Sequence, residues 1–123
     1  MKKTTPAESN YIKITNDELD KLNAIVIGLL KKWELNEKQK SALISEHPSS
    51  ETHLRLSILL NIHEELRLMF NNPINIYGYM KMINHNAPFY GSRPIDLACK
   101  DIEGLKLTYR AIYDVSTTVF RTR

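Results

Sequence analysis

Apolar side chains recur at alternating steps of three and four residues along much of this chain, and this spacing constrains the fold more than any other feature. The first run follows Thr15 and Glu18, whose separation predicts a capping box at a helix start. The apolar positions of this run are Leu19, Leu22, Val26, Leu29 and Trp33. Because an α-helix turns once in 3.6 residues, all five side chains fall on one face. The spacing therefore predicts an amphipathic helix.

The next two segments continue the helical pattern. Asn36 is a good N-cap, and a second helix from there to about His47 and Pro48 completes a helical hairpin with the first. A third, longer helix begins at Ser49 or Ser50. Its broad apolar face comprises Leu54, Ile58, Leu59, Ile62, Leu66 and Met69. A face this wide predicts a central helix covered on several sides.

A proline near the start of each of two further segments indicates where their helices begin. Pro73 suits the first turn of a fourth helix that we expect to reach Asn84. Gly78 inside it costs about 1 kcal/mol relative to alanine, so we expect a neighbouring segment to approach closely there. Pro94 likewise begins a short helix.

A last helix begins near Asp101, and because helical propensity is lower at 116–118 the sequence leaves two alternatives for residues 115–123, a continuation of the helix or a mobile tail. No alternating pattern is long enough for a strand. We therefore predict an all-α protein, a compact bundle of about six helices. Residues 1–14 form a flexible lead-in, 15–48 an N-terminal hairpin, and 49–123 one domain with the central helix and a C-terminal binding region.

Composition excludes several classes of protein. Hydrophobic residues make up 42% and charged residues 25% of the chain, which is typical of a folded globular domain. The net charge of +3 is spread along the sequence, so nucleic-acid binding is permitted but not required. One cysteine allows no internal disulfide, and no signal peptide or membrane-length apolar run is present. We expect a cytoplasmic protein without a membrane span.

The sequence contains no recognisable catalytic or metal-binding constellation. The four histidines lack the paired spacing of a zinc site, and the partner that His63 would need four residues later is Arg67. Cys99 lies where a small buried hydrophobic residue fits, an interpretation we prefer to a reactive thiol. Four glycines make no phosphate-binding loop. We expect no metal, no cofactor and no enzymatic activity.

Two segments are candidates for contacts with another molecule. Residues 84–94 are rich in turn formers and include the adjacent aromatic residues Phe89 and Tyr90, which either pack into the bundle or serve as interface anchors. The C-terminal Phe120, Arg121 and Arg123 belong either to a frayed end, the interpretation we favour, or to a tip that enters an acidic pocket.

Several of these segments, taken in order, resemble the toxin-binding domain of the Xre/MbcA/ParS antitoxins. The resemblance rests on Asn72 and Pro73 at a helix start, the run Asn86–Leu97, and Leu105 followed by Tyr109–Asp114. Leu56–His63 is similar to the helix that precedes that domain. The resemblance covers roughly residues 20–114, and it is the order and spacing of the pieces that make it specific.

The resemblance implies an antitoxin of a type II toxin–antitoxin system. Its partner would carry a RES domain, which depletes NAD, and the antitoxin would neutralise this cognate toxin by blocking its active site. The candidate toxin-binding residues are Phe89, Tyr90, Arg93, Asp96, Arg110, Phe120, Arg121 and Arg123.

The chain departs from the family in two places. Between Leu43 and Leu54 too little sequence remains for a recognition helix and its turn, although Lys31, Lys32, Lys38 and Lys40 cluster around the hairpin. DNA binding is therefore in doubt, and a DNA-binding helix-turn-helix regulator is kept as the alternative hypothesis. The loop also has Tyr90, Ser92 and Arg93 where the family would have glycine, a basic residue and a small polar residue. The many apolar helix faces favour a homodimer.

Overall fold

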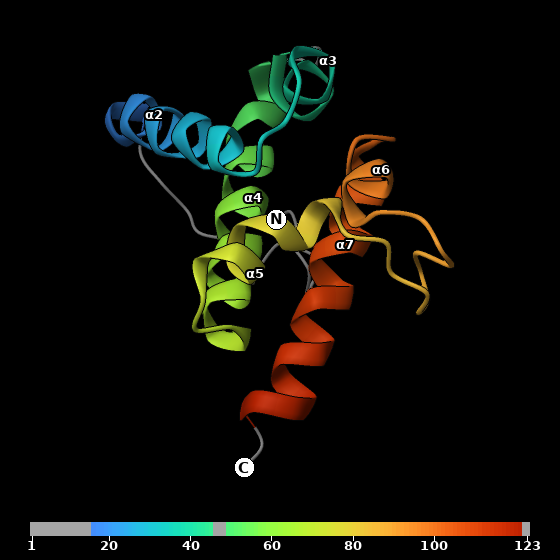
Figure 1. Ribbon diagram of the computed structural model, residues 1–123. Helices are drawn as coiled ribbons and strands as arrows, with labels where there is room; N and C mark the ends of the chain where they lie inside the picture. Colours follow the sequence, from blue (N-terminus) through green and yellow to red (C-terminus); the bar gives the residue numbers. More distant parts are fainter. Residues whose placement is uncertain (1–15, 46–48, 122–123) are drawn as a thin grey trace, which may run out of the picture.

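Helices provide all the regular structure of residues 16–45 and 49–121, the part of the chain that this computed structural model describes (Figure 1). The α-helices of this part are α2 (Asn16–Lys32), α3 (Glu37–Lys40), α4 (Ser49–Met69), α5 (Pro73–Gly78), α6 (Pro94–Ala98) and α7 (Ile102–Val115). The π-helix η1 (Ser41–Ser45), the 3-10 helix η2 (Tyr79–Lys81) and the π-helix η3 (Ser116–Arg121) extend them. Within these residues an isolated bridge joins Asn84 to Ser92 and no strand forms. The all-α prediction is confirmed.

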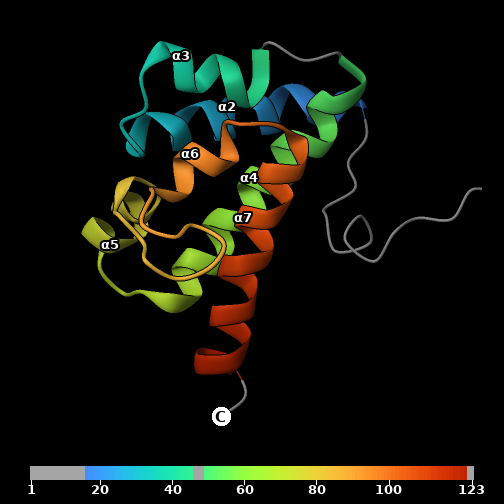
Figure 2. The ribbon, with the colours of Figure 1, turned by 90° about the vertical axis from the view of Figure 1, so that its right-hand side faces the viewer.

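Helix α4 lies at the centre of the molecule. It packs against α7 along its length, against α2 near its N-terminal half, and against α5 (Figures 1 and 2). Its fully buried apolar side chains are Leu56, Ile58, Leu59, Ile62 and Leu66. Since they point to more than one side of the helix, burying them requires neighbours on several sides. This explains the broad apolar face seen in the sequence.

The helix expected from Asn36 to His47 is divided in two. The Asn36 side chain accepts a hydrogen bond from the Gln39 amide at 2.8 Å, and the Gln39 side chain accepts one from the Asn36 amide at 3.0 Å. This capping box confirms the predicted start. After Lys40 the helix widens into η1, and residues 46–48 lie outside the described part.

A buried arginine connects η1 to α4. Arg55 is 2% exposed; its Nε donates to the Glu51 carboxylate at 3.0 Å and its Nη1 donates to the Leu43 carbonyl oxygen at 3.2 Å. A charge taken out of water needs such partners, because unpaired it would cost several kcal/mol. Arg55 therefore fixes the end of the N-terminal hairpin against the central helix.

The fourth helix is shorter than predicted. The α-helical part stops at Gly78, η2 adds one turn, and Met82 is extended, so helix does not reach Asn84. Asn84 pairs with Ser92 instead of continuing the helix, and the Lys81 carbonyl oxygen, which a further helical turn would pair with an amide, accepts from the Arg93 Nε at 3.0 Å. The expected close approach at Gly78 is also wrong, because a Cβ there would meet nothing within 4 Å.

The close approach occurs instead at Gly104, where α6 meets α7. Asp101 caps α7 by accepting a hydrogen bond from the Gly104 amide at 2.7 Å. A Cβ on Gly104 would overlap the backbone carbonyl oxygen of Leu97 in α6. Glycine at this position lets the two helices pack closely.

The N-terminal and C-terminal predictions are tested only in part. Residues 1–14 and Thr15 lie outside the described residues. At the other end, Ser116 begins η3, so the expected loss of propensity coincides with a change from α-helix to π-helix. No helix of the described part is long and apolar enough to cross a membrane.

Replacing the two glycines by alanine should have opposite effects on stability. Gly104→Ala should lower the free energy of unfolding by about 1–3 kcal/mol, because the new Cβ forces α6 away from α7. Gly78→Ala has free space and should raise it by up to about 1 kcal/mol. Urea unfolding followed by circular dichroism measures both. Equal shifts for the two variants would contradict the packing described here.

Candidate functional site

The loop of residues 84–94 stands outside the helices, beside α6, and is closed at its base (Figures 1 and 2). The Asn84 amide donates to the Ser92 carbonyl oxygen at 2.9 Å, and the Gly91 amide donates to the Asn84 carbonyl oxygen at 2.8 Å. The Asn84 side chain adds a hydrogen bond to the Tyr79 hydroxyl at 3.1 Å. The ends of the loop are therefore held together and to η2.

Hydrogen bonds inside the loop also fix its tip. The carbonyl oxygen of Asn86 accepts from the amides of Phe89 and Tyr90, at 2.9 and 3.1 Å. The Phe89 carbonyl oxygen accepts from the amide and the hydroxyl of Ser92, at 3.0 and 2.7 Å. A loop whose backbone groups are paired internally holds one shape without help from a partner.

The two neighbouring aromatic residues have opposite environments. Phe89 is 5% exposed and so follows the core interpretation, whereas Tyr90 is 79% exposed and follows the interface interpretation. Tyr90 has φ of 48°, in the left-handed region that bulky residues rarely adopt. The loop thus uses Phe89 as an internal anchor and presents Tyr90 to solvent, at a conformational cost on the order of 1 kcal/mol.

Other exposed groups flank Tyr90 in the sequence. Met82 and Ile83, which immediately precede the loop, are each more than half exposed. Arg93 is exposed, and its bond to the Lys81 carbonyl oxygen holds the guanidinium beside the loop base. Asp96, in the first turn of α6, accepts a 3.4 Å hydrogen bond from the Arg93 amide. The structure therefore places Tyr90, Arg93 and Asp96 on one continuous segment.

Arg110 is not brought to this segment. It is exposed on α7, next to the buried Tyr109, and makes no hydrogen bond or ion pair with the loop in the part of the chain described here. The backbone of Phe120 and Arg121 belongs to η3, but the side chains of Phe120, Arg121 and Arg123 lie outside the described residues. Of these candidates, only Arg110 can therefore be placed relative to the loop.

Replacing each aromatic residue should separate their roles. Phe89→Ala removes a buried ring and should lower the free energy of unfolding by about 3 kcal/mol. Tyr90→Asn should leave it unchanged or raise it by up to about 1 kcal/mol, since asparagine tolerates the left-handed conformation. Urea unfolding compares the two. A larger loss from Tyr90→Asn than from Phe89→Ala would mean that the loop is packed differently.

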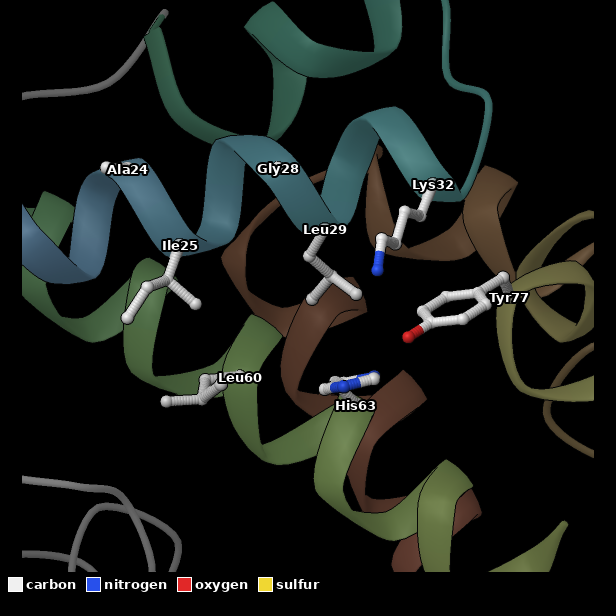
Figure 3. A pocket seen from close by; sticks show the side chains of 8 residues that line it. All are labelled: Ala24, Ile25, Gly28, Leu29, Lys32, Leu60, His63 and Tyr77. Atoms are coloured by element: carbon white, nitrogen blue, oxygen red, sulfur yellow. The ribbon is translucent and has the colours of Figure 1, made fainter. Parts of the chain in front are cut away.

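A pocket between α2, α4 and α5 was not predicted from the sequence. Its volume is about 290 Å³, and Figure 3 shows its walls. The lining residues are Ala24, Ile25, Gly28, Leu29, Lys32, Leu60, His63 and Tyr77. The apolar spacing of α2 assigned a buried stripe to one face, and gave no indication that the adjacent positions 25, 28 and 32 would face a hollow.

Three polar side chains meet at one end of this pocket. The Lys32 ammonium lies 5.1 Å from the centre of the Tyr77 ring, within cation–π distance. The Tyr77 and His63 rings stack at 5.7 Å with an interplanar angle of 19°. Figure 3 shows all three turned toward the same space. A second hollow of about 590 Å³ continues on the far side of Lys32 and Tyr77, toward Ile74 and Lys81.

Burial lowers the pKa of His63 below its ordinary value of 6.5. The nearby cations Arg67 and Lys32 act in the same direction, and the Glu64 carboxylate opposes them. The ring Nδ1 is buried and has no hydrogen-bond partner, which also disfavours the doubly protonated form. His63 is therefore neutral at pH 7, and Lys32 provides the positive charge at this end of the pocket.

The pKa of His63 predicts that stability falls on acidification. As the pH falls through 6.5 the unfolded chain binds a proton at His63 that the folded chain does not, so the free energy of unfolding decreases until the pH reaches the lower pKa of the folded state. His63→Gln should reduce this slope. Urea unfolding at several pH values measures it, and an unchanged slope in the variant would show that His63 titrates normally.

Other chemically active side chains do not assemble into a site. Within residues 16–45 and 49–121, no three His, Cys, Asp or Glu side chains lie where they would hold a metal ion. Burial, assisted by the Asp96 carboxylate and opposed by Arg55, raises the pKa of the half-buried Cys99 thiol to about 11. The thiol therefore stays protonated at neutral pH and is a poor nucleophile.

Comparisons with protein-family models, with curated proteins and with solved structures find no match to this chain. Its function is therefore inferred from the loop, the pocket and the motifs of its own sequence.

Proposed function

We propose that this protein is the antitoxin of a type II toxin–antitoxin system, and that the loop of residues 84–94 docks on a RES-domain toxin and blocks its active site. The observation that carries the proposal is the exposed Tyr90 on a loop that is fixed before any partner arrives. The sequence resemblance of Asn86–Leu97 and Tyr109–Asp114 to the toxin-binding domain of the Xre/MbcA/ParS antitoxins supports the choice of partner.

The geometry of the loop favours binding to a protein over catalysis. Exposed tyrosines are frequent centres of binding energy at interfaces, because one rigid side chain supplies both apolar area and a hydrogen-bonding hydroxyl. A loop that is already ordered loses little conformational entropy on docking. Arg93 and Asp96 would supply the charged rim that surrounds such an anchor.

DNA binding is the weaker alternative. Among the described residues, the second helix of the hairpin is α-helical only over the four residues of α3 and continues as the π-helix η1, unlike the α-helix that a helix-turn-helix domain places in the major groove. Two of the four clustered lysines, Lys31, Lys32, Lys38 and Lys40, already have intramolecular contacts, because Lys40 pairs with Glu37 at 3.0 Å and Lys32 lies over Tyr77. Among the described residues, no feature of this hairpin specifically favours a role as a DNA-binding regulator. The homodimer remains a prediction.

Substitution of Tyr90 should weaken toxin binding without unfolding the antitoxin. Tyr90→Asn, which keeps the loop conformation, should lower affinity for the product of the adjacent toxin gene by about 30-fold or more, as expected for an interface hot spot. It should also abolish growth rescue on co-expression. Affinity is measured by calorimetric titration of the purified toxin with the separately purified antitoxin or its variant.

Ile74→Ser is the matched control. Ile74 is 80% exposed, on α5 and outside the loop, so its replacement should leave affinity and rescue unchanged. If Tyr90→Asn binds and rescues as well as the parent protein, the loop is not the docking surface. If no neighbouring gene product binds the parent protein, the antitoxin proposal itself is lost.

A further inference from the structure

The pocket between α2, α4 and α5 has an apolar end and a polar end. Ile25 and Leu60 lie at one end, with Leu29 in the middle, while Lys32, His63 and Tyr77 occupy the other end (Figure 3). The space between the two ends is open and is not filled by the side chains that line it. A ligand that matches the pocket therefore needs an apolar body and a polar head.

The charge at the polar end selects the sign of that head. Lys32 is exposed and belongs to none of the ion pairs among the described residues, and its ammonium lies over the Tyr77 ring and acts electrostatically on His63. By contrast, Lys81, which lines the second hollow, already donates to the Glu34 carbonyl oxygen at 2.9 Å. The carboxylate of Glu64, next to His63 in the sequence, pairs with Arg67 at 3.8 Å and not with Lys32. An anion is the group that would complete the contacts of Lys32.

The size of the pocket limits the body. From Ala24 to Lys32 the helix rises about 12 Å, at roughly 1.5 Å per residue. The volume of about 290 Å³ is near the lower end of the range for small-molecule sites. A single medium-length alkyl chain fits these dimensions, whereas a folded domain does not.

We propose that this pocket binds a carboxylate carrying a medium-length apolar chain, with the head on Lys32 and Tyr77 and the chain along Ile25, Leu29 and Leu60. The ammonium of Lys32 and the hydroxyl of Tyr77 donate to the carboxylate. The side chains of α2 and α4 pack against the alkyl chain and remove the contacted side from water. Gly28 adds no side chain to the middle of the pocket, where a Cβ would stand in free space with no atom within 4 Å.

This site is separate from the docking loop. In Figure 1, α2 extends to the left of α4 and α5 crosses in front of α4, whereas the loop of residues 84–94 extends to the right beyond α7. The ligand proposal therefore does not depend on the antitoxin proposal, and a substitution in the pocket tests it without touching Tyr90 or Arg93.

The test is a titration of the full chain with octanoate, by calorimetry and by amide NMR shifts. We expect saturable binding at one site, with shifts centred on residues 24–32, 60–63 and 77. Octanol and octylamine carry the same chain without the negative charge, and acetate carries the head without the chain, so all three should bind at least about tenfold more weakly. Equal binding of octanoate and octanol, or no binding of octanoate, would overturn the proposal.

Two variants and one control locate the ligand. Lys32→Met should weaken octanoate binding about ten- to hundredfold, the loss expected for one charge-assisted hydrogen bond. Gly28→Leu should abolish binding by filling the pocket. Lys31→Met removes an exposed charge from the same helix end without altering the lining and should change affinity less than about twofold. An equal effect of Lys31→Met and Lys32→Met, or undiminished binding in a folded Gly28→Leu protein, would show that octanoate binds elsewhere.

Discussion

The burial of α4 between α2 and α7 is the interaction on which the rest of this structure depends. Leu56, Ile58 and Ile62 have no exposed surface, so neither neighbouring helix can leave without returning apolar area to water. The smaller elements are attached to this frame through single, identifiable contacts. Arg55 fixes η1 to α4, Gly104 lets α6 approach α7, and Arg93 binds the end of the fourth helix at the Lys81 carbonyl oxygen. The loop of residues 84–94 joins two of these smaller elements, η2 and α6, and the pocket lies between α5, α4 and α2.

The sequence predicted the architecture well because the apolar spacing is strong in α2, α4 and α7, where packing follows local periodicity. It was least accurate where a contact distant in sequence decides the geometry. At the end of the fourth helix the Lys81 carbonyl oxygen accepts from Arg93, twelve residues later, and the tight helix contact occurs at Gly104 instead of Gly78. Neither contact produces a periodic pattern.

The candidate sites show the same difference between features that local sequence predicts and features that depend on the folded structure. The turn-rich composition of residues 84–94 indicated an ordered loop, and two adjacent aromatic residues indicated an anchor. Which ring would be buried depended on the internal hydrogen bonds of Asn86 and Ser92, and these form only in the folded loop. The pocket was missed because Lys32, His63 and Tyr77 come from three helices, and separately each looks like an ordinary surface or core residue.

The paired base of the loop has a consequence for how such a protein changes over time. The base is closed by the Asn84 amide on the Ser92 carbonyl oxygen and by the Gly91 amide on the Asn84 carbonyl oxygen, and both bonds use backbone atoms alone. Other residues of the tip are thus free to be exchanged, provided that Phe89 still fills its buried place and that Gly91, with φ of 93°, stays glycine. A lineage built on this scaffold would alter the surface that the loop presents through a handful of substitutions while the helical frame stayed the same.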